Sequence, residues 1–238
     1  MPEKRLAGQV AVVTGGSKGI GRAVAYALAR EGAHVVLAAR SSKELDAVVQ
    51  EFTREGLKAS QVPTDISIPS QVAALIEGTV DGFGRLDILV NNAGIGIFKN
   101  VEELAVEEFD AMWNVNLRGV FLASKAALPA MIKANRGAIV NISSLAGKNS
   151  IKGGAGYCAT KWGLRGFASS LMLEVREYHI RVVTIFPGSV ATDFSQQGKK
   201  GPNITQPEDV ASAVVFAVTA PERSMFSEID VRPTNPAR

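Results

Sequence analysis

The sequence has little cysteine and histidine and contains no long apolar run. Its 238 residues include one cysteine and two histidines. One cysteine excludes an intramolecular disulfide framework and a site of several metal-bound thiolates, and it fits a reducing compartment. With so few histidines and no paired Cys or carboxylate spacing, we expect no metal site. The longest apolar run, residues 210–220, falls well short of the roughly 20 residues that a membrane-spanning helix needs.

Signal-peptide character and clustered charge are also missing. The first ten residues, MPEKRLAGQV, have no apolar core, so we expect a cytoplasmic protein that does not associate with a membrane. The formal net charge is only +3, and the basic residues are scattered rather than gathered in a stripe, which argues against nucleic-acid binding. The sequence is 46% hydrophobic, which is too apolar for a disordered chain and fits a soluble globular domain.

What the sequence does contain is an alternation of short β-branched segments with longer helical ones. The expected strands are 9–14, 34–39, 58–63, 86–91, 138–143, 181–186 and 226–231. The expected helices are 20–31, 42–55, 69–83, 106–134, 157–178 and 207–218. This alternation predicts an α/β fold, a doubly wound parallel sheet of about seven strands with helices on both faces. Because we find no repeat, low-complexity segment or linker, we expect a single domain over residues 1–238.

A glycine-rich turn lies between the first expected strand and the first expected helix. It reads Thr14-Gly-Gly-Ser-Lys-Gly-Ile-Gly21. Glycines here let the backbone approach a pyrophosphate, whose charge the helix N-terminus favours. A turn that serves chain geometry alone is the alternative. The strand before it, the helix after it and Lys18 within it favour a dinucleotide site.

The end of the second expected strand indicates which dinucleotide is bound. NAD-binding units carry an acidic residue near this point to hold the ribose hydroxyls, but Ala39 and Arg40 stand here. Arg40 offers a planar fork of donors to a 2′-phosphate, and Lys18 adds a second positive charge. Either cation alone can be an ordinary solvated side chain. Together they predict NADP(H) as the cofactor rather than NAD(H).

A second group of chemically suggestive residues follows the fifth expected strand. Ser144 comes directly after the strand, and Tyr157 and Lys161 stand four residues apart on one face of an expected helix. A free tyrosine has a pKa near 10, and a nearby ammonium lowers that pKa, as general acid–base work requires. Ser144 is placed to hydrogen-bond a substrate oxygen. A Tyr-x-x-x-Lys pair by itself occurs by chance on many helices, so its weight depends on the other motifs.

Taken together, these motifs resemble those of the short-chain dehydrogenase/reductase family over nearly the whole chain. The matching residues are Thr14-Gly-x-x-x-Gly-Ile-Gly21, Asn91-Asn92-Ala93-Gly94, Asn116, Ser144, Tyr157-x-x-x-Lys161, and Pro187-Gly188 followed by Thr192. The resemblance implies a Rossmann-like fold and reversible hydride transfer with a nicotinamide cofactor. It implies that Tyr157 is the proton donor in carbonyl reduction and the base in alcohol oxidation.

The resemblance also implies roles for residues that the sequence alone does not single out. Ser144 would stabilise the substrate oxygen, Lys161 would bind the nicotinamide ribose, and Asn116 would anchor a water that leads protons to Lys161. From the residues alone, Asn116 would be an ordinary amide on the surface of the helix 106–134. The implied cofactor-binding residues are Gly15, Ser17, Lys18, Gly19, Ile20, Gly21, Arg40, Asp65 (at the adenine), Asn92, Ala93, Gly94, Tyr157, Lys161, Pro187, Gly188, Val190 and Thr192.

Substrate choice is expected to depend on residues 193–206, a short polar segment that predicts a lid within the domain. The other expected substrate-side residues are Ser144, Ala146, Ile151, Gly154 and Phe98, with Gly96 and Ile97 beside them. Gly154 removes a side chain three residues before Tyr157, which suggests a pocket that is roomy or depends on the lid. Cys158 is expected to be a small buried hydrophobe rather than a nucleophile.

The sequence therefore predicts an NADPH-dependent enzyme that reduces a small-molecule carbonyl to an alcohol. The alternatives are an NAD(P)-dependent hydroxy-acid or alcohol dehydrogenase that runs mainly in oxidation, and a non-catalytic dinucleotide-binding protein. The glycine-rich ending of typical 3-oxoacyl-carrier-protein reductases is missing from residues 228–238, which weakens a role in fatty-acid synthesis. Faces of small residues in 116–134 and 158–172 predict a homodimer or homotetramer.

Overall fold

The computed structural model describes residues 4–194 and 204–234, and its strands form one parallel sheet. In this part of the chain the strands are β1 (Val10–Thr14), β2 (His34–Ala39), β3 (Ala59–Pro63), β4 (Ile88–Asn91), β5 (Gly137–Ile142), β6 (Ile180–Pro187) and β7 (Glu228–Val231). They lie in the order β3-β2-β1-β4-β5-β6-β7, and every neighbouring pair is parallel. The expected doubly wound, Rossmann-like sheet is confirmed.

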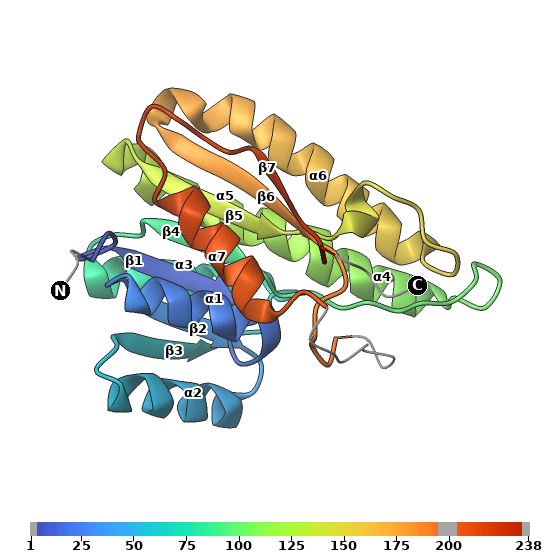
Figure 1. Ribbon diagram of the computed structural model, residues 1–238, viewed down its shortest axis with the longest axis horizontal. Helices are drawn as coiled ribbons and strands as arrows, with labels where there is room; N and C mark the ends of the chain where they lie inside the picture. Colours follow the sequence, from blue (N-terminus) through green and yellow to red (C-terminus); the bar gives the residue numbers. More distant parts are fainter. Residues whose placement is uncertain (1–3, 195–203, 235–238) are drawn as a thin grey trace.

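Helices cover both faces of the sheet (Figure 1). They are α1 (Gly19–Arg30), α2 (Ser42–Arg54), α3 (Pro69–Phe83), α4 (Val106–Trp113), α5 (Gly119–Ala134), α6 (Ala155–Val175) and α7 (Pro207–Val218). Apolar side chains of α1, α2 and α7 pack with the strands in one cluster, and those of α3, α5 and α6 pack in another. Of the helices in the described ranges, none is long and apolar enough to cross a membrane.

The central strand shows why this sequence needs helices on both sides. All residues of β1 are buried, because successive side chains of a strand point to opposite faces and here both faces are apolar. Ala11 and Val13 join the core beneath α1, whereas Val10 and Val12 join the core on the other face. The near-continuous valine run is therefore a signature of a strand buried on both faces.

The segment 106–134 differs from the single helix that its pattern predicts. It consists of α4, a π-helical turn at Asn114–Arg118, and α5. The turn makes contacts with segments distant in the sequence: a Cβ on Gly119 would lie 2.9 Å from the Ile66 carbonyl oxygen, and the Asn116 side chain hydrogen-bonds to the backbone of Ile95. Such turns occur often at functional sites, and hydropathy patterns do not reveal them.

The strand register brings the motif residues to one edge of the sheet. Val13 pairs with Val90, Asn91 with Asn141, and Ile142 with Ile185, so the carboxyl ends of β1, β4, β5 and β6 lie in a row. The direction of chain progression across the sheet reverses between β1 and β4, since β1 has β2 on one side and β4 on the other. Ligands of open α/β sheets bind in the crevice at this point.

Candidate active site

The glycine turn after β1 is compressed to a degree that only glycine allows. Gly15 and Gly19 adopt positive φ angles of 66° and 54°. A Cβ on Gly15 would lie 2.8 Å from the Asn92 Nδ2 atom, and a Cβ on Gly21 would collide with the Gly15 carbonyl oxygen. Glycine is therefore needed here for two reasons: it adopts the left-handed backbone conformation without strain, and it lets the turn lie close to α1 and to the end of β4.

The start of α1 fits an anionic group. Lys18 precedes the helix in an extended conformation, and within the described part of the chain no side chain caps this N-terminus. The first turn carries no acidic residue, and Lys18 is exposed. Uncapped backbone N–H groups and the positive end of the helix dipole together form an anion site, which is what a pyrophosphate requires.

Thr14 and Asn92 join the glycine turn to the end of β4. The Thr14 hydroxyl accepts hydrogen bonds from the backbone N–H groups of Asn92 and Ala93, at 3.0 and 3.1 Å. The Asn92 side chain donates back to the carbonyl oxygens of Thr14 and Gly15, at 2.9 and 3.2 Å. Asn92 and Ala93, which were expected to bind the cofactor, thus lie against the glycine turn. The sequence showed Thr14 only as the first residue of the glycine motif, whereas in the structure its hydroxyl and carbonyl groups join the glycine turn to the end of β4.

Beyond β2, the structure adds a residue that the sequence analysis missed. Ser41 caps α2 by accepting the Glu44 N–H at 3.3 Å, and the Glu44 carboxylate accepts the Ser17 hydroxyl from the glycine turn at 2.9 Å. A carboxylate therefore lies beside Ser17, on the helix that follows Arg40, the exposed residue that was expected to meet a 2′-phosphate. The S-x-x-E spacing of a capping box was the available signal, but it gave no indication of the Ser17 contact.

Asp65, after β3, belongs to a tight local turn. One carboxylate oxygen accepts both the N–H and the hydroxyl of Ser67, at 2.9 and 2.6 Å. These hydrogen bonds lower the pKa of Asp65, and the positive charge of Arg40 acts in the same direction. Arg40 and Asp65 are therefore close enough to interact across the carboxyl ends of β2 and β3. The adenine contact implied for Asp65 remains a prediction.

Tyr157 is buried, and its environment departs from the expectation of a lowered pKa. The ring is only 6% exposed. Burial raises the pKa of Tyr157 to about 12 because water no longer stabilises the phenolate, while the nearby Ser144 hydroxyl acts in the opposite direction. Ser144 lies at the end of the strand-to-helix turn, where its hydroxyl also accepts the Ala146 N–H at 3.1 Å. The phenol is thus held in its protonated form.

Lys161 shares the face of α6 with Tyr157, as its spacing predicts, but its charge is not directed at the phenol. Its ammonium donates to the Ile142 carbonyl oxygen at 3.0 Å and lies 5.7 Å from the Tyr157 ring centre. Burial lowers the pKa of Lys161 to about 8, since the ammonium has lost most of its water. Lys161 therefore does not lower the pKa of Tyr157 as expected, and burial of the phenol raises it instead.

Asn116 is fully buried in the π-helical turn, not on a helix surface. Its amide nitrogen donates to the Ile95 carbonyl at 2.9 Å and to the Thr160 hydroxyl at 3.1 Å, and its amide oxygen accepts the Ile95 N–H at 2.8 Å. A Cβ on Gly94 would lie 3.3 Å from this amide oxygen and 3.8 Å from the Lys161 ammonium. The structure therefore brings Gly94, Asn116 and Lys161 together beside Tyr157.

The segment after β6 returns to the first turn. The Gly188 N–H donates to the Val231 carbonyl at 2.8 Å, and Val190 pairs with Thr205 in an isolated parallel bridge. The methyl group of Thr192 lies 3.4 Å from where a Cβ of Gly19 would be. Residues 187–192 thus connect the end of β6 with the glycine turn after β1. These are the residues that were expected to hold the nicotinamide. Residues 195–203 of the expected lid lie outside the described residues.

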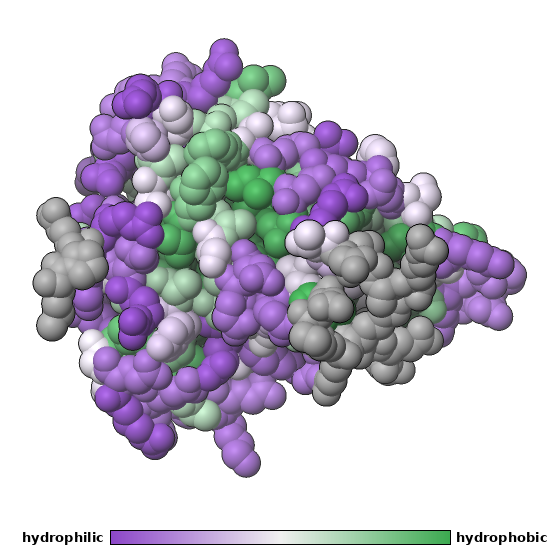
Figure 2. All heavy atoms as spheres, in the orientation of Figure 1, coloured by the Kyte–Doolittle hydropathy of each residue, from purple (hydrophilic) through white to green (hydrophobic). Residues whose placement is uncertain are grey.

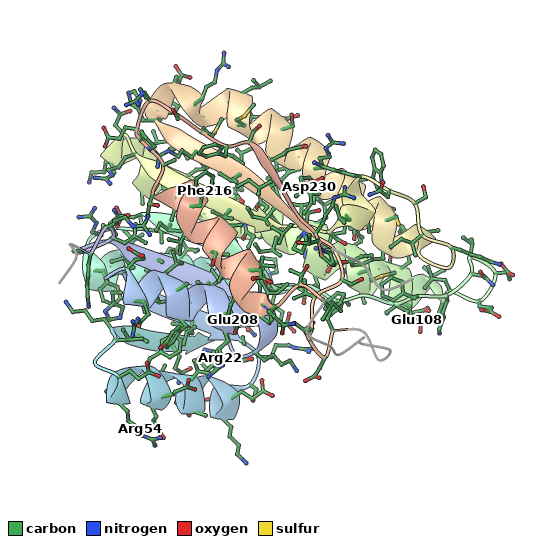
Figure 3. All side chains as sticks on the ribbon, viewed as in Figure 1. Arg22, Arg54, Glu108, Glu208, Phe216 and Asp230 are labelled. Atoms are coloured by element: carbon green, nitrogen blue, oxygen red, sulfur yellow. The ribbon has the colours of Figure 1, made fainter. Side chains whose placement is uncertain are left out.

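An ionic cluster fixes the turn that carries Ser144. Lys148 follows this turn, and its ammonium lies 2.7 Å from Asp230 and 2.9 Å from Glu228 on β7. Arg165 on α6 also contacts Glu228, at 2.6 Å. Figure 3 shows Asp230 on the strand that faces this turn. The cluster connects the turn, α6 and the last strand.

The substrate-side residues are only partly gathered. Phe98 contacts Tyr157, with ring centres 5.2 Å apart, and Ala146 is buried in the same apolar cluster. Ile151 is 44% exposed. Gly154 itself opens no free space, since a Cβ there would lie 3.1 Å from the Cβ of Ile151, and the expectation of a roomy or lid-dependent pocket stays a prediction.

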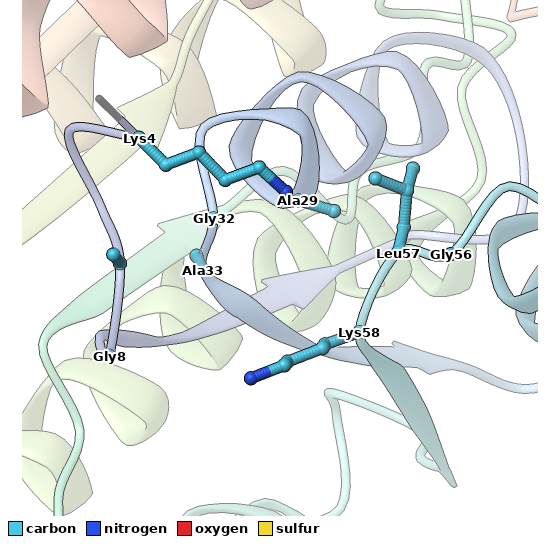
Figure 4. Close-up of a pocket in the computed structure, with 9 residues that line it drawn as sticks. Lys4, Gly8, Ala29, Gly32, Ala33, Gly56, Leu57 and Lys58 are labelled. Atoms are coloured by element: carbon cyan, nitrogen blue, oxygen red, sulfur yellow. The ribbon is translucent and has the colours of Figure 1, made fainter. Parts of the chain in front are cut away.

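A separate hollow of about 150 Å³ lies at the other edge of the sheet (Figure 4). Lys4, Gly8 and Lys58 are among its lining residues, and the last two lie just before the starts of β1 and β3. It therefore opens at the amino ends of the strands, whereas ligands of such sheets bind at the carboxyl ends. Among the described residues, no group of His, Cys, Asp and Glu side chains has the arrangement of a metal site.

Fold and site together define a dinucleotide-binding oxidoreductase of the Rossmann type. A model of the short chain dehydrogenase family matches residues 9–203, and the chain belongs to that family. An uncharacterized oxidoreductase of Staphylococcus aureus (strain MRSA252) is 36% identical over 96% of this chain and 98% of its own length. Glycine betaine reductase of Emericella nidulans is 35% identical over 98% of this chain, which spans 19% of that larger protein.

Two solved structures resemble the whole chain. A metagenomic short-chain oxidoreductase in complex with NADP is 42% identical, with a TM-score of 0.88 over 98% of this chain and 100% of that chain. The alcohol dehydrogenase of Thermococcus sibiricus, complexed with 5-hydroxy-NADP, is 33% identical, with a TM-score of 0.89 over 97% of this chain and 99% of that chain. The expected family and fold are confirmed, and the expected cofactor agrees with those of both neighbours.

Proposed function

We propose that the protein is an NADPH-dependent carbonyl reductase. The observation that carries this proposal is the convergence of Tyr157, Ser144, Lys161, Asn116 and Gly94 at one edge of the sheet, beside the glycine turn. A phenol, a hydroxyl and a buried ammonium in this order supply a proton donor, an oxygen-binding group and a positive charge. A protein that only binds a dinucleotide has no use for all of them.

The described residues fit NADP(H). The uncapped start of α1 and the compressed glycine turn offer backbone donors to the pyrophosphate. Lys18 and Arg40 are exposed cations, before α1 and after β2, at the two elements that would flank a 2′-phosphate. The charge of Arg40 also lowers the pKa of Asp65. The NADP and 5-hydroxy-NADP of the two similar structures support the same assignment.

The chain's own residues would act on the carbonyl oxygen. When bound, NADPH supplies the hydride; the protein supplies orientation and protons. Ser144 would hydrogen-bond the carbonyl oxygen and hold it against the Tyr157 hydroxyl. With a pKa of about 12, Tyr157 keeps its proton at neutral pH, which is the state that a proton donor for reduction requires. Lys161 would hold the nicotinamide ribose, and Asn116 would anchor the water that restores the proton.

A single set of assays tests the proposal against both alternatives. NADPH consumption is measured with a panel of ketones, aldehydes and 3-oxo esters, and NADP⁺ reduction is measured with the corresponding alcohols and hydroxy acids. We expect carbonyl-dependent NADPH consumption to exceed alcohol-dependent NADP⁺ reduction at neutral pH. The reverse ratio would indicate an alcohol or hydroxy-acid dehydrogenase. Tight NADPH binding without turnover on any substrate would indicate a dinucleotide-binding protein.

We also propose that the protein assembles as a homodimer or homotetramer. The faces of α5 and α6 that were expected to pair carry exposed aromatic side chains, among them Phe121 and Trp162, at 44% and 47% exposure. A second exposed aromatic pair, Phe216 and Phe226, lies over α7 and the segment before β7, where Figure 2 shows apolar residues gathered. Exposed apolar patches of this kind are typical of protein interfaces. Sedimentation velocity of the purified protein tests this, and a monomer would contradict it.

A further inference from the structure

Two phenylalanines from distant parts of the chain meet over the Tyr157 ring. Phe98 comes from the segment after β4, and its ring centre lies 5.2 Å from that of Tyr157. Phe194 comes from the segment after β6, and its ring centre lies 6.0 Å from that of Tyr157. Both rings are tilted by about 50° relative to Tyr157, at 54° and 52°, which is a geometry that aromatic pairs favour over a face-to-face sandwich.

Gly96 makes this meeting possible. A Cβ at position 96 would lie 2.9 Å from the Phe194 ring atom Cε1 and 3.0 Å from the Phe98 ring atom Cε2. Any side chain here would therefore push at least one of the rings away. Because Gly96 has no positive φ angle, the backbone at this position does not itself require glycine. Glycine is needed at position 96 because the absence of a side chain leaves room for the two rings.

The two phenylalanines differ from ordinary packed rings in their exposure. Tyr157 is 6% exposed, whereas Phe98 and Phe194 are 45% and 44% exposed. Each ring thus covers the reacting tyrosine with one side and leaves a large apolar surface open with the other. A flat apolar group that packs against this surface would remove it from water, and the hydrophobic effect would favour its binding.

The neighbouring charges do not favour an anionic substrate. Lys99, next to Phe98, is paired with Glu108 at 2.6 Å, so its charge is already neutralised. Asp193, next to Phe194, is exposed and adds a negative charge. Recognition at this pair of rings therefore depends on apolar stacking rather than on an ion pair with a carboxylate.

We propose that Phe98 and Phe194 form an aryl-binding pair that selects carbonyl compounds with a planar aromatic group next to the carbonyl carbon. This inference rests on the proposed reductase function and names its substrate class. An aryl ketone would stack its ring on the phenylalanines while its oxygen reaches Ser144 and Tyr157. A saturated ring of the same size presents no flat face and would stack poorly.

The test compares two ketones with the same number of carbon atoms, acetophenone and cyclohexyl methyl ketone. The measured quantity is the ratio of their kcat/KM values at saturating NADPH. We expect Phe98→Leu and Phe194→Leu each to lower the aryl-to-cyclohexyl ratio by about fivefold, since aromatic pairs contribute about 1 kcal/mol beyond their buried area. Gly96→Ala should lower it in the same direction by displacing the rings. Phe83→Leu, a similarly exposed phenylalanine at the end of α3, is the matched control and should leave the ratio unchanged.

Two outcomes would overturn the inference. A ratio within about twofold of the wild type in both leucine variants would show that the rings do not recognise the aryl group. An equal fall for both ketones would show that the rings only shield Tyr157. If no carbonyl is turned over, the proposed function fails, but dissociation constants of the same ketones, measured by NMR titration of wild type and variants, still decide whether the aryl-binding pair exists.

Discussion

The proposed cofactor side of the site leaves little free space around its main chain, whereas the proposed substrate side is lined by half-exposed side chains. On the cofactor side, the Thr14 hydroxyl and the Asn92 amide hydrogen-bond to main-chain groups, and Gly15 and Gly21 allow close approaches. On the substrate side, half-exposed aromatic rings lie over one buried tyrosine. The difference implies that filling space at the glycine turn weakens the binding of either dinucleotide, whereas changes of exposed side chains alter which dinucleotide or substrate is preferred.

The largest expected effect on cofactor binding comes from filling the space at the glycine turn. Gly21→Ala would place a Cβ against the Gly15 carbonyl and the Asn92 amide, neither of which can move freely. Overpacking of this kind costs about 1–3 kcal/mol, so we expect NADPH affinity to fall by up to about 100-fold and the melting temperature to fall as well. Fluorescence titration with NADPH and thermal unfolding measure both.

Gly78→Ala is the matched control for this change. Gly78 lies within α3, where a Cβ meets no atom within 4 Å among the described residues. Alanine stabilises such a helical position by about 0.5–1 kcal/mol, so the melting temperature should rise slightly and NADPH binding should not change. Equal effects of the two substitutions would mean that the close approach at Gly21 is unimportant.

The next largest effect concerns the choice between the two dinucleotides. Arg40→Asp replaces the proposed phosphate-binding cation with a carboxylate, and charge-assisted hydrogen bonds are worth about 1.5–3 kcal/mol. We expect the NADPH-to-NADH ratio of kcat/KM to fall by about 50-fold. Arg54→Asp, at the far end of α2 (Figure 3), makes the same change of charge and should leave the ratio nearly unchanged.

The pH dependence of reduction depends on Lys161. Its pKa is lowered to about 8, so the ammonium is lost above that pH, while Tyr157 with a pKa of about 12 retains its proton. Because kcat/KM reports ionisations of the free enzyme, it should be flat below about pH 8 and fall by about tenfold per pH unit above it. A profile that stays flat to pH 10 would mean that the charge of Lys161 is not needed.

The smallest expected effect lies at Glu44, which accepts the Ser17 hydroxyl from the first turn of α2, the helix that follows Arg40. Its negative charge opposes a 2′-phosphate at this position, and glutamine keeps the hydrogen bond without the charge. We expect Glu44→Gln to tighten NADPH binding by about threefold, the effect of an exposed charge pair, and to leave NADH binding unchanged. Glu77→Gln on α3 is the control for net charge. Weaker NADPH binding in Glu44→Gln would contradict this arrangement.

The difference between the two sides also explains how far the sequence could predict the site. Valine-rich strands, a glycine turn and i, i+4 spacing are local patterns. The sheet, the turn after β1 and the shared helix face of Tyr157 and Lys161 could therefore be predicted from the sequence. The π-helical turn around Asn116 depends on contacts of Gly119 and Ile95 with segments distant in the sequence. Local patterns contain no such information.

The sign of the tyrosine pKa shift was missed for a related reason. A helical spacing places Lys161 near Tyr157 but does not tell how deeply either is buried or that Lys161 donates to the Ile142 carbonyl. Burial decides both pKa values. The contact of Phe194 with Tyr157 and that of Glu44 with Ser17 likewise join segments far apart in the chain.

The most direct test of the account is Tyr157→Phe, measured for both turnover and NADPH binding. Removing one hydroxyl takes away the proposed proton donor and leaves the glycine turn intact, so kcat should fall by about 100- to 10,000-fold while the dissociation constant of NADPH stays within about twofold. Tyr26→Phe, which removes a hydroxyl bound to Glu55 at the end of α2, is the control and should retain full turnover. A Tyr157→Phe variant that keeps wild-type turnover would contradict the mechanism.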